Sequence, residues 1–346
     1  MNEMKIRREE ILSLPMCYAV SELRTPRGTL GVCASEGLGG CRVYAKDAPS
    51  RQASVWENAG GCMSISQLEE DGTFLAVQNF FPGFDAGQAR LVKAKPDGDG
   101  WRVEPFMDAP YLHRFDVIHR QGRRFLVTCT LCGSKAFRDD WSSPGQVCVG
   151  ELVNGTQPPA RMRPLIPALT KNHGFWHGMH AGREVLLIAG MEGLYEVAVP
   201  GGADGEWAAE RLLDREISDA AAVDIDGDGV EELVTIEGFH GDHVAVNKWV
   251  NDRWEMVYRC PAPFAHVVWG GDVLGRPGLL LAYRGDNGAL MLLRKSSWQG
   301  GFYMDHTMID ELVRPTNFTV QSGKRLCVID AACAGTQKIM RYSLSL

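Results

Sequence analysis

Long apolar runs and an excess of positive charge are both missing from this chain of 346 residues. No stretch approaches the roughly 18 apolar residues of a transmembrane helix, so we expect no membrane partner. Lys and Arg number 36 against 43 Asp and Glu, which gives a net charge of −7. A protein with a net negative charge lacks the positive potential that displaces counterions from nucleic-acid phosphates, so nucleic acid is not an expected partner.

Signals for secretion and for structural zinc are also absent. The first residues, MNEMKIRREE, are charged and contain no apolar stretch, so we expect no secretory signal and a cytoplasmic protein. Its ten cysteines are then expected to be reduced thiols. Cys129 and Cys132 form a C-x-x-C pair, but no second pair follows at zinc-ribbon spacing, which argues against a structural zinc.

Helical periodicity is the third absence, and short β-branched runs stand in its place. The 39 glycines and 17 prolines punctuate these runs along the whole chain, which is typical of a protein with many strands. A hydrophobic content of 45% with 23% charged residues is that of a folded protein. The sequence therefore predicts an all-β fold.

One pattern of four strands recurs along the chain, and its second strand is the clearest part. This strand is an unbroken apolar run, as expected for a strand buried on both faces. Seven copies are found: TLGVCAS from Thr29, TFLAVQN from Thr73, RFLVTCT from Arg124, EVLLIAG from Glu184, EELVTIE from Glu231, GLLLAYR from Gly278 and RLCVIDA from Arg325. The 346 residues divide into seven units of about 49, which is the size of a propeller blade.

We therefore predict a single domain, residues 1–346, that forms a seven-bladed β-propeller with four-stranded blades. The last unit, ending at KIMRYSLSL, shows three strands, and a propeller ring needs closure. Residues 4–12 resemble the fourth-strand segment WRVEPFMDAP, so we expect them to supply the outer strand of the last blade. The alternative is a frayed helix at the N-terminus.

An acidic loop lies between two strands of the fifth unit. Asp224, Asp226, Asp228 and Glu232 offer oxygen ligands at positions 1, 3, 5 and 9 of this loop, and hard oxygen ligands suit Ca²⁺. The loop resembles the D-x-D-x-D-G loop of FG-GAP or VCBS propeller repeats, which implies a structural calcium. The alternative is an acidic turn that holds no metal.

Histidines recur at one position of the repeat, the residue just before each first strand. The seven aligned residues are Met16, Cys62, His113, His173, Ser218, His266 and Asn317. First strands line the central channel of a propeller, so these residues are expected to converge at one mouth of it. Converging imidazoles indicate a transition-metal site held by His113, His173 and His266. The alternative is three separate histidines bonded to channel waters or carbonyls. His119, His177 and His180 are expected to be structural or to lie behind the ligands.

The loops between second and third strands are expected to open at the same mouth. They carry residues suited to a small polar sugar substrate, in which Trp stacks on a ring and Arg neutralises an anionic oxygen. We predict His240, Tyr283 or Lys135 as the catalytic base, leaving the choice among them open. The predicted substrate-binding residues are Arg138, Trp141, Arg284 and Asn317.

Two enzyme families share parts of this pattern. The histidine ring resembles that of oligogalacturonate lyases, propellers that hold a divalent metal, typically manganese, with three His and a Gln. No Gln is aligned here, and Asn317 or a water would have to substitute. The acidic loop and the segments PYLHRFDV and DDWSSPG resemble the propeller part of aldos-2-ulose dehydratases, although this chain is too short for their additional domains.

Both resemblances imply β-elimination from an oxidised sugar. We expect a divalent ion, Mn²⁺, Zn²⁺ or similar, to stabilise the enolate-like charge while a base removes the neighbouring proton. The hypothesis is a metal-dependent lyase or dehydratase acting on a keto-sugar, keto-glycoside or uronate. One alternative is a non-catalytic propeller platform that binds a glycan or a protein. A weaker one is a metal-dependent lactonase, although such sites are usually built from carboxylates around calcium.

Overall fold

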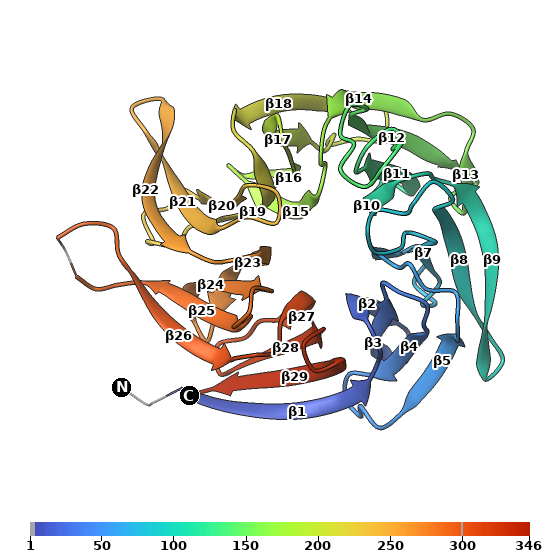
Figure 1. Ribbon diagram of the computed structural model, residues 1–346, viewed down its shortest axis with the longest axis horizontal. Helices are drawn as coiled ribbons and strands as arrows, with labels where there is room; N and C mark the ends of the chain where they lie inside the picture. The colour runs from blue at the N-terminus through green and yellow to red at the C-terminus, as the bar shows by residue number, and fades with distance from the viewer. Residues whose placement is uncertain (1–3, 299) are drawn as a thin grey trace.

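The computed structural model describes residues 4–298 and 300–346, which form strands and turns arranged as seven sheets in a ring (Figure 1). The first four sheets contain β2–β5 (Cys17–Thr25, Gly28–Ser35, Cys41–Ala45, Gln52–Trp56), β6–β9 (Ile65–Gln67, Phe74–Gln78, Arg90–Asp97, Gly100–Asp108), β10–β14 (Leu112–Arg120, Arg123–Thr130, Gly145–Val153, Gln157–Pro159, Arg163–Leu169) and β15–β18 (Gly174–His180, Arg183–Gly190, Gly193–Ala198, Ala208–Leu213). The last three contain β19–β22 (Ile217–Val223, Glu232–Glu237, His243–Val250, Arg253–Pro261), β23–β26 (Ala265–Val273, Arg276–Tyr283, Leu290–Lys295, Met304–Asp310) and β27–β29 with β1 (Pro315–Gln321, Leu326–Cys333, Lys338–Ser345, Lys5–Ser13). The predicted seven-bladed β-propeller is confirmed.

Each blade is an antiparallel sheet whose second strand is buried on both faces. In β16, Leu186 and Ile188 pack against the preceding blade, whereas Val185 and Leu187 pack against the following one. Adjacent residues of a strand point to opposite faces, so both sets of side chains are buried only where blades flank the sheet on both sides. Each of these side chains contributes about 2 kcal/mol of hydrophobic stabilisation. This packing explains why the second strands read as unbroken apolar runs.

The N-terminal strand closes the ring. β1 pairs antiparallel with β29 from Lys5↔Ser345 to Ser13↔Lys338, so the last blade combines the two ends of the described chain (Figure 1). Arg8 reaches the neighbouring blade and donates hydrogen bonds to the carbonyl oxygen of Ile309. The predicted closure by residues 4–12 is confirmed, and the alternative of a frayed helix is wrong.

The third blade departs from the four-stranded plan, because its outer strand is split into two pieces. β13 pairs with Leu152 and Val153 of β12, and β14 pairs with the earlier part of the same strand. Pro158 and Pro159 lie in β13, and a proline lacks the amide hydrogen that a continuous ladder needs. The outer edge is therefore interrupted without disturbing the channel.

A β-bulge near the start of the first strand recurs in five blades. One residue is skipped in the pairing with the second strand, and a bulge of this kind redirects a side chain. The skipped residues are Tyr18, His113, Ser218, His266 and Thr316. Met16, Tyr111 and Phe264 lie two residues before three of the bulges and have φ values of 49°, 57° and 56°, so the chain turns sharply before each of these first strands.

Candidate metal centre

The bulges bring side chains from different blades to one mouth of the central channel. His113 lies in a bulge of β10, His266 lies in a bulge of β23, and His173 directly precedes β15. All three side chains are buried. The ring centroids of His113 and His173 are 4.5 Å apart, and those of His173 and His266 are 5.3 Å apart. The structure thus brings together the three histidines that the repeat singled out.

Backbone carbonyls of the next blade fix two of these rings. Nδ1 of His173 donates to the Ser218 carbonyl oxygen at 2.9 Å, and Nδ1 of His266 donates to the Thr316 carbonyl oxygen at 2.6 Å. A carbonyl oxygen only accepts, so each ring carries its hydrogen on Nδ1 and keeps a lone pair on Nε2. This is how histidines that bind metals are commonly oriented. Nε2 of His173 is buried and has no partner among the described atoms.

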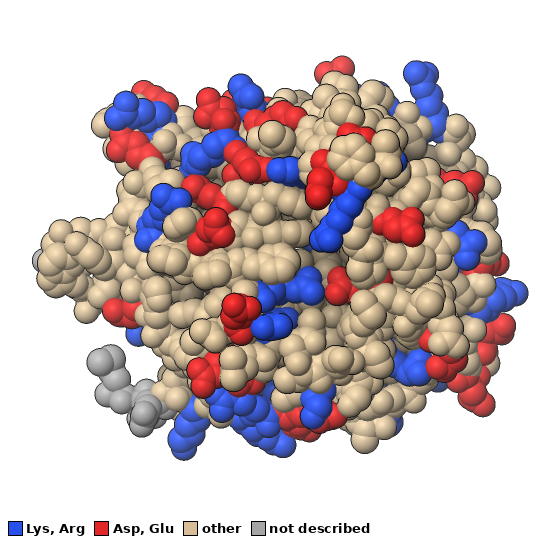
Figure 2. Space-filling view, in the orientation of Figure 1, with Lys and Arg blue, Asp and Glu red and all other residues tan. Residues whose placement is uncertain are grey.

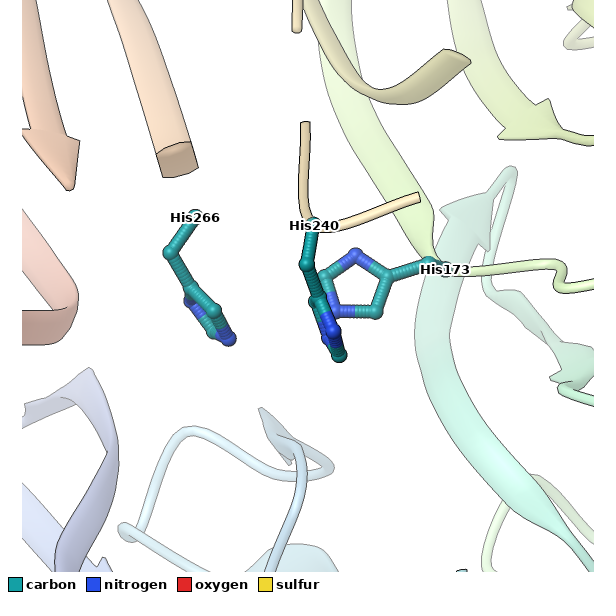
Figure 3. Close-up of side chains that lie close together, drawn as sticks. All are labelled: His173, His240 and His266. Carbon is teal, nitrogen blue, oxygen red and sulfur yellow. The ribbon is translucent and has the colours of Figure 1, made fainter. Parts of the chain in front are cut away.

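His240 is the fourth imidazole of the cluster. It lies between β20 and β21 in a left-handed conformation, with a φ of 52°, and its ring stacks on Phe239 with centroids 4.1 Å apart. Nitrogen atoms of His173, His240 and His266 all lie within 4.8 Å of one another (Figure 3). The rings of His240 and His266 are nearly parallel, with an interplanar angle of 17°. His240, predicted as a base, therefore lies in the group that is suited to hold an ion.

His113 lies beside this trio and shares a neighbour with it. The Tyr18 hydroxyl is 3.5 Å from Nε2 of His113 and 3.3 Å from Nε2 of His266. Nδ1 of His113 is buried and has no partner that meets hydrogen-bond geometry. Tyr18 is buried and comes from β2, so the first blade also contributes a side chain that contacts His113 and His266.

Burial keeps all four imidazoles neutral. It lowers the pKa of His113, His173 and His266 well below the ordinary value, with further lowering from nearby cationic or imidazole groups. The pKa of His240 falls to about 4, first through burial and then through the charge of Arg284. Neutral imidazole is the form that coordinates a metal ion, so the cluster is ready to bind at neutral pH.

A cavity of about 260 Å³ is lined by His113, His240 and His266, whereas His173 does not line it. Glu36 and Arg284 face it as an ion pair of 3.4 Å, each with less than a fifth of its side chain exposed. Burial raises the pKa of Glu36, although Arg284 opposes the shift. Four phenylalanines also line the cavity, namely Phe80, Phe81, Phe84 and Phe264. In Figure 2, basic and acidic side chains lie close to the middle of the ring.

A second cavity, of about 180 Å³, occupies the channel and is lined by residues of all seven blades. Asn317 lines it and donates from Nδ2 to the Tyr18 carbonyl oxygen at 3.1 Å. Arg114 and Asp219 line the same chamber. Asp219 accepts a hydrogen bond from the amide of Val268, and burial raises its pKa to about 7. The channel thus contains a carboxyl group and a guanidinium that are not paired with each other.

The other predicted catalytic and binding residues occupy varied positions. Arg138 lines the cavity of about 260 Å³, together with Arg284. Lys135 donates to the carbonyl oxygens of Arg138 and Asp140, and its ammonium lies 3.3 Å from the ring centre of Trp141. Neither Lys135 nor Trp141 lines the cavity, and one face of the Trp141 ring is covered. Tyr283 ends β24 and packs into the core between blades, so it does not line the cavity either.

Two further histidines, His177 and His180 of β15, are bonded to carboxylates, whereas the His119 ring of β10 has no such partner among the described residues. His177 bridges Asp116 and Glu184, with 2.8 Å from each ring nitrogen to a carboxylate oxygen. Burial disfavours the charged ring, but the two carboxylates outweigh it and raise the pKa of His177. His180 is bonded to Glu196. Both nitrogens of His177 are engaged, which agrees with the structural role expected of it.

In the acidic loop, a lysine side chain already lies among the expected calcium ligands. Oxygen atoms of Asp224, Asp226 and Glu232 lie within 4.8 Å of one another. Both oxygens of Asp224 accept backbone amides, from Gly227, Asp228 and Gly229. The Lys248 ammonium lies 2.7 Å from Asp226, 2.6 Å from Asp228 and 2.9 Å from Glu232. The geometry fits an ammonium group, and a calcium ion would have to displace it.

Sequence reasoning missed three residues at these two sites. Tyr18 was not recognised as the equivalent of the histidines, because the sequence alignment of the first blade placed Met16, two residues earlier, at the repeat position. Glu36 was recognisable only as one polar residue of the loop CASEGLGG. Lys248 lies on the strand β21 and not in the acidic loop, and a signal for it would have been the single lysine of this strand, HVAVNKWV.

Comparisons with known proteins identify the architecture. No family model and no curated protein matches the chain. Virginiamycin B lyase from Staphylococcus aureus is a similar solved structure, covering 99% of this chain and 100% of its own, with a TM-score of 0.57 and 10% identity. A candidate 6-phosphogluconolactonase from Bacteroides uniformis covers 93% of this chain and 89% of its own, with a TM-score of 0.51 and 12% identity.

No helix with the length and apolar character needed to span a membrane is found in residues 4–298 and 300–346. At 10% and 12% identity, the similar structures show the fold and not the chemistry. The chain is a seven-bladed β-propeller.

Proposed function

We propose that this protein is a metal-dependent lyase or dehydratase that performs β-elimination on an oxidised sugar, namely a keto-sugar, a keto-glycoside or a uronate. The observation that carries the proposal is the convergence of His173, His240 and His266, whose nitrogens lie within 4.8 Å of one another. Two of the rings are fixed by carbonyls, and all three are neutral. His173, His240 and His266 would hold a divalent ion, which would supply positive charge to polarise a carbonyl or carboxylate oxygen and to stabilise enolate-like charge.

The cavity lined by three of the four clustered histidines suits such a substrate. Its volume of about 260 Å³ accommodates a small ring, and Phe264 and Phe84 offer apolar faces to the C–H groups of a sugar. Arg284 and Arg138 offer guanidinium groups to an anionic oxygen, in the role of clamp expected from the sequence. The resemblance to oligogalacturonate lyases and aldos-2-ulose dehydratases supports the same class of reaction.

Glu36 is the proton acceptor that the cavity favours. Its carboxylate faces the cavity, and burial raises its pKa toward the range in which a base works efficiently near neutral pH. When Arg284 turns to an anionic substrate oxygen, Glu36 loses its ion-pair partner and becomes a stronger base. His240 takes the role of a ligand in this scheme. Lys135 and Tyr283 stay as predicted alternatives, although the cavity is lined by neither.

The test combines metal content with turnover. Purified protein loaded with Mn²⁺ or Zn²⁺ is expected to hold one ion, and a panel of uronates and 3-keto-glycosides is expected to give enone absorbance. His173→Ala should lose both the ion and the absorbance. His306→Ala should keep both, because His306 lies on the outer strand β26 and bonds to Tyr258. A wild-type protein without bound ion would refute the proposal and favour the binding platform.

A further inference from the structure

Tyr18 occupies, in the first blade, the position that histidines occupy in two others. It is the residue skipped in the pairing of β2 with β3, as His113 is skipped in β10 and His266 in β23. The same bulge therefore points the phenol to the channel mouth where the imidazoles converge. Position in the fold makes Tyr18 a member of the ring.

The distances around the Tyr18 oxygen match those between ligands of one ion. Its hydroxyl lies 3.3 Å from Nε2 of His266 and 3.5 Å from Nε2 of His113. Hydrogen bonds from a hydroxyl usually bring the two atoms to about 2.8 Å. Two ligands bound tetrahedrally to zinc at about 2.1 Å stand roughly 3.4 Å apart. Both observed distances are long for hydrogen bonds and agree with ligand spacing.

The surroundings explain why a phenol would be useful there. The nearby imidazoles are neutral and would give only lone pairs to an ion. The side chains of Arg114 and Arg284 add positive charge close to the four histidines. A divalent ion in that setting has no anionic partner from the ring of histidines. A phenolate oxygen would supply one negative charge and a hard ligand, which manganese favours over imidazole alone.

On these grounds we propose that Tyr18 is an oxygen ligand of the ion held by the histidine cluster. The proposal rests on the proposed function, because it concerns the same centre. On binding, the Tyr18 O–H bond breaks, its proton passes to solvent, and an oxygen–metal bond forms without any change of oxidation state.

Spectroscopy and calorimetry test this assignment without measuring turnover. Cu²⁺ added to the metal-free protein is expected to give a visible phenolate-to-copper charge-transfer band. Tyr18→Phe should still bind one ion but lose the band, release one proton fewer on binding, and hold Mn²⁺ at least about tenfold more weakly. Tyr18→His, which installs the residue that two other blades use, should recover affinity without the band.

The control is Tyr258→Phe, which removes a phenol from the outer strand β22 and should leave the band and the affinity unchanged. A band and a Mn²⁺ affinity that survive in folded Tyr18→Phe would overturn the assignment while leaving the proposed lyase intact. A wild-type protein that binds no ion would refute both. Far-ultraviolet circular dichroism and urea unfolding establish that each variant is folded.

Discussion

The Lys248 ammonium lies 2.9 Å from a carboxylate oxygen of Glu232, whose side chain is fully buried. Burial works against the charge of Lys248, but its bonds to Asp226, Asp228 and Glu232 outweigh burial and raise its pKa. The lysine provides the positive charge that a calcium ion would supply in a loop of this composition. Glu232 also accepts the amide of Ile225, so the pair anchors the loop to the start of β20.

Removing this ammonium is expected to make the loop dependent on calcium. Lys248→Ala leaves a buried carboxylate unpaired, which should lower the free energy of unfolding by about 3 kcal/mol in a chelator. Millimolar Ca²⁺ should restore most of that loss in the variant and change the wild type little. Urea unfolding with and without Ca²⁺ measures both effects.

The matched control is Lys5→Ala, which removes an exposed lysine from β1 and should show neither effect. Stoichiometric binding of Ca²⁺ to the wild type at micromolar concentration would contradict this view. That result would support the calcium site predicted from the spacing of the acidic residues.

Glu36→Gln is predicted to separate proton transfer from metal binding. The amide preserves shape but cannot accept the proton, so turnover should fall by at least about 100-fold while metal content stays unchanged. The wild-type rate should rise with pH as Glu36 ionises, above a pKa that burial has raised. Steady-state kinetics from pH 5 to 8 with elemental analysis make the measurement.

Glu57→Gln serves as the comparison, since Glu57 is exposed and pairs with Arg42 away from the cavity. It should retain full activity. A Glu36→Gln variant with wild-type turnover would move the role of base to one of the residues predicted from sequence, His240, Tyr283 or Lys135.

The features of the fold that could be predicted were those that depend on the local pattern of apolar residues. Leu186 and Val185 face different blades, so the strand between them has no polar face, and its apolar run is visible in the sequence. The closing strand was predictable for a related reason, because its last residues include the apolar Ile11 and Leu12, which are buried in the core. Neither inference required knowledge of contacts between distant residues.

The candidate site was predictable only where the repeat kept its register. His113 and His266 lie at equivalent bulges, so alignment of the blades found them. Tyr18 lies at the same bulge, but a bulge inserts a residue and leaves no mark in the sequence. His240 comes from a loop, outside the repeat position, and only the folded chain shows its nitrogen close to those of His173 and His266.

Closure of the ring by β1 is expected to be measurable as stability. Leu12 is buried, pairs with Ile339 and belongs to the same core cluster as Tyr44, so Leu12→Ala should cost about 3 kcal/mol of unfolding free energy. Ser13→Ala, the neighbouring substitution at an exposed position, should cost less than about 0.5 kcal/mol. Urea unfolding of both variants makes the comparison, and equal stabilities would mean that the strand does not close the ring in solution.

Asp219 should give the protein an unusual dependence of stability on pH. Burial raises its pKa from an ordinary 3.8 to about 7, so between these values the folded state holds a proton that the unfolded state has lost. The unfolded state then binds fewer protons, and the free energy of unfolding falls as pH rises through this window. The loss attributable to Asp219 approaches about 4 kcal/mol by pH 7 and stays constant above it.

Asp219→Asn is neutral at every pH, and its side-chain oxygen can still accept the amide of Val268. The variant should therefore be similar in stability to the wild type near pH 4 and become progressively more stable than it up to pH 7. Chelator-treated samples unfolded in urea from pH 4 to 8 isolate this effect from that of a bound ion. Asp97→Asn, at an exposed position, should follow the wild-type curve. A difference in the free energy of unfolding between Asp219→Asn and the wild type that stays constant from pH 4 to 8 would contradict this prediction. It would show that Asp219 ionises in the folded state with an ordinary pKa, which requires water to reach the carboxylate inside the channel.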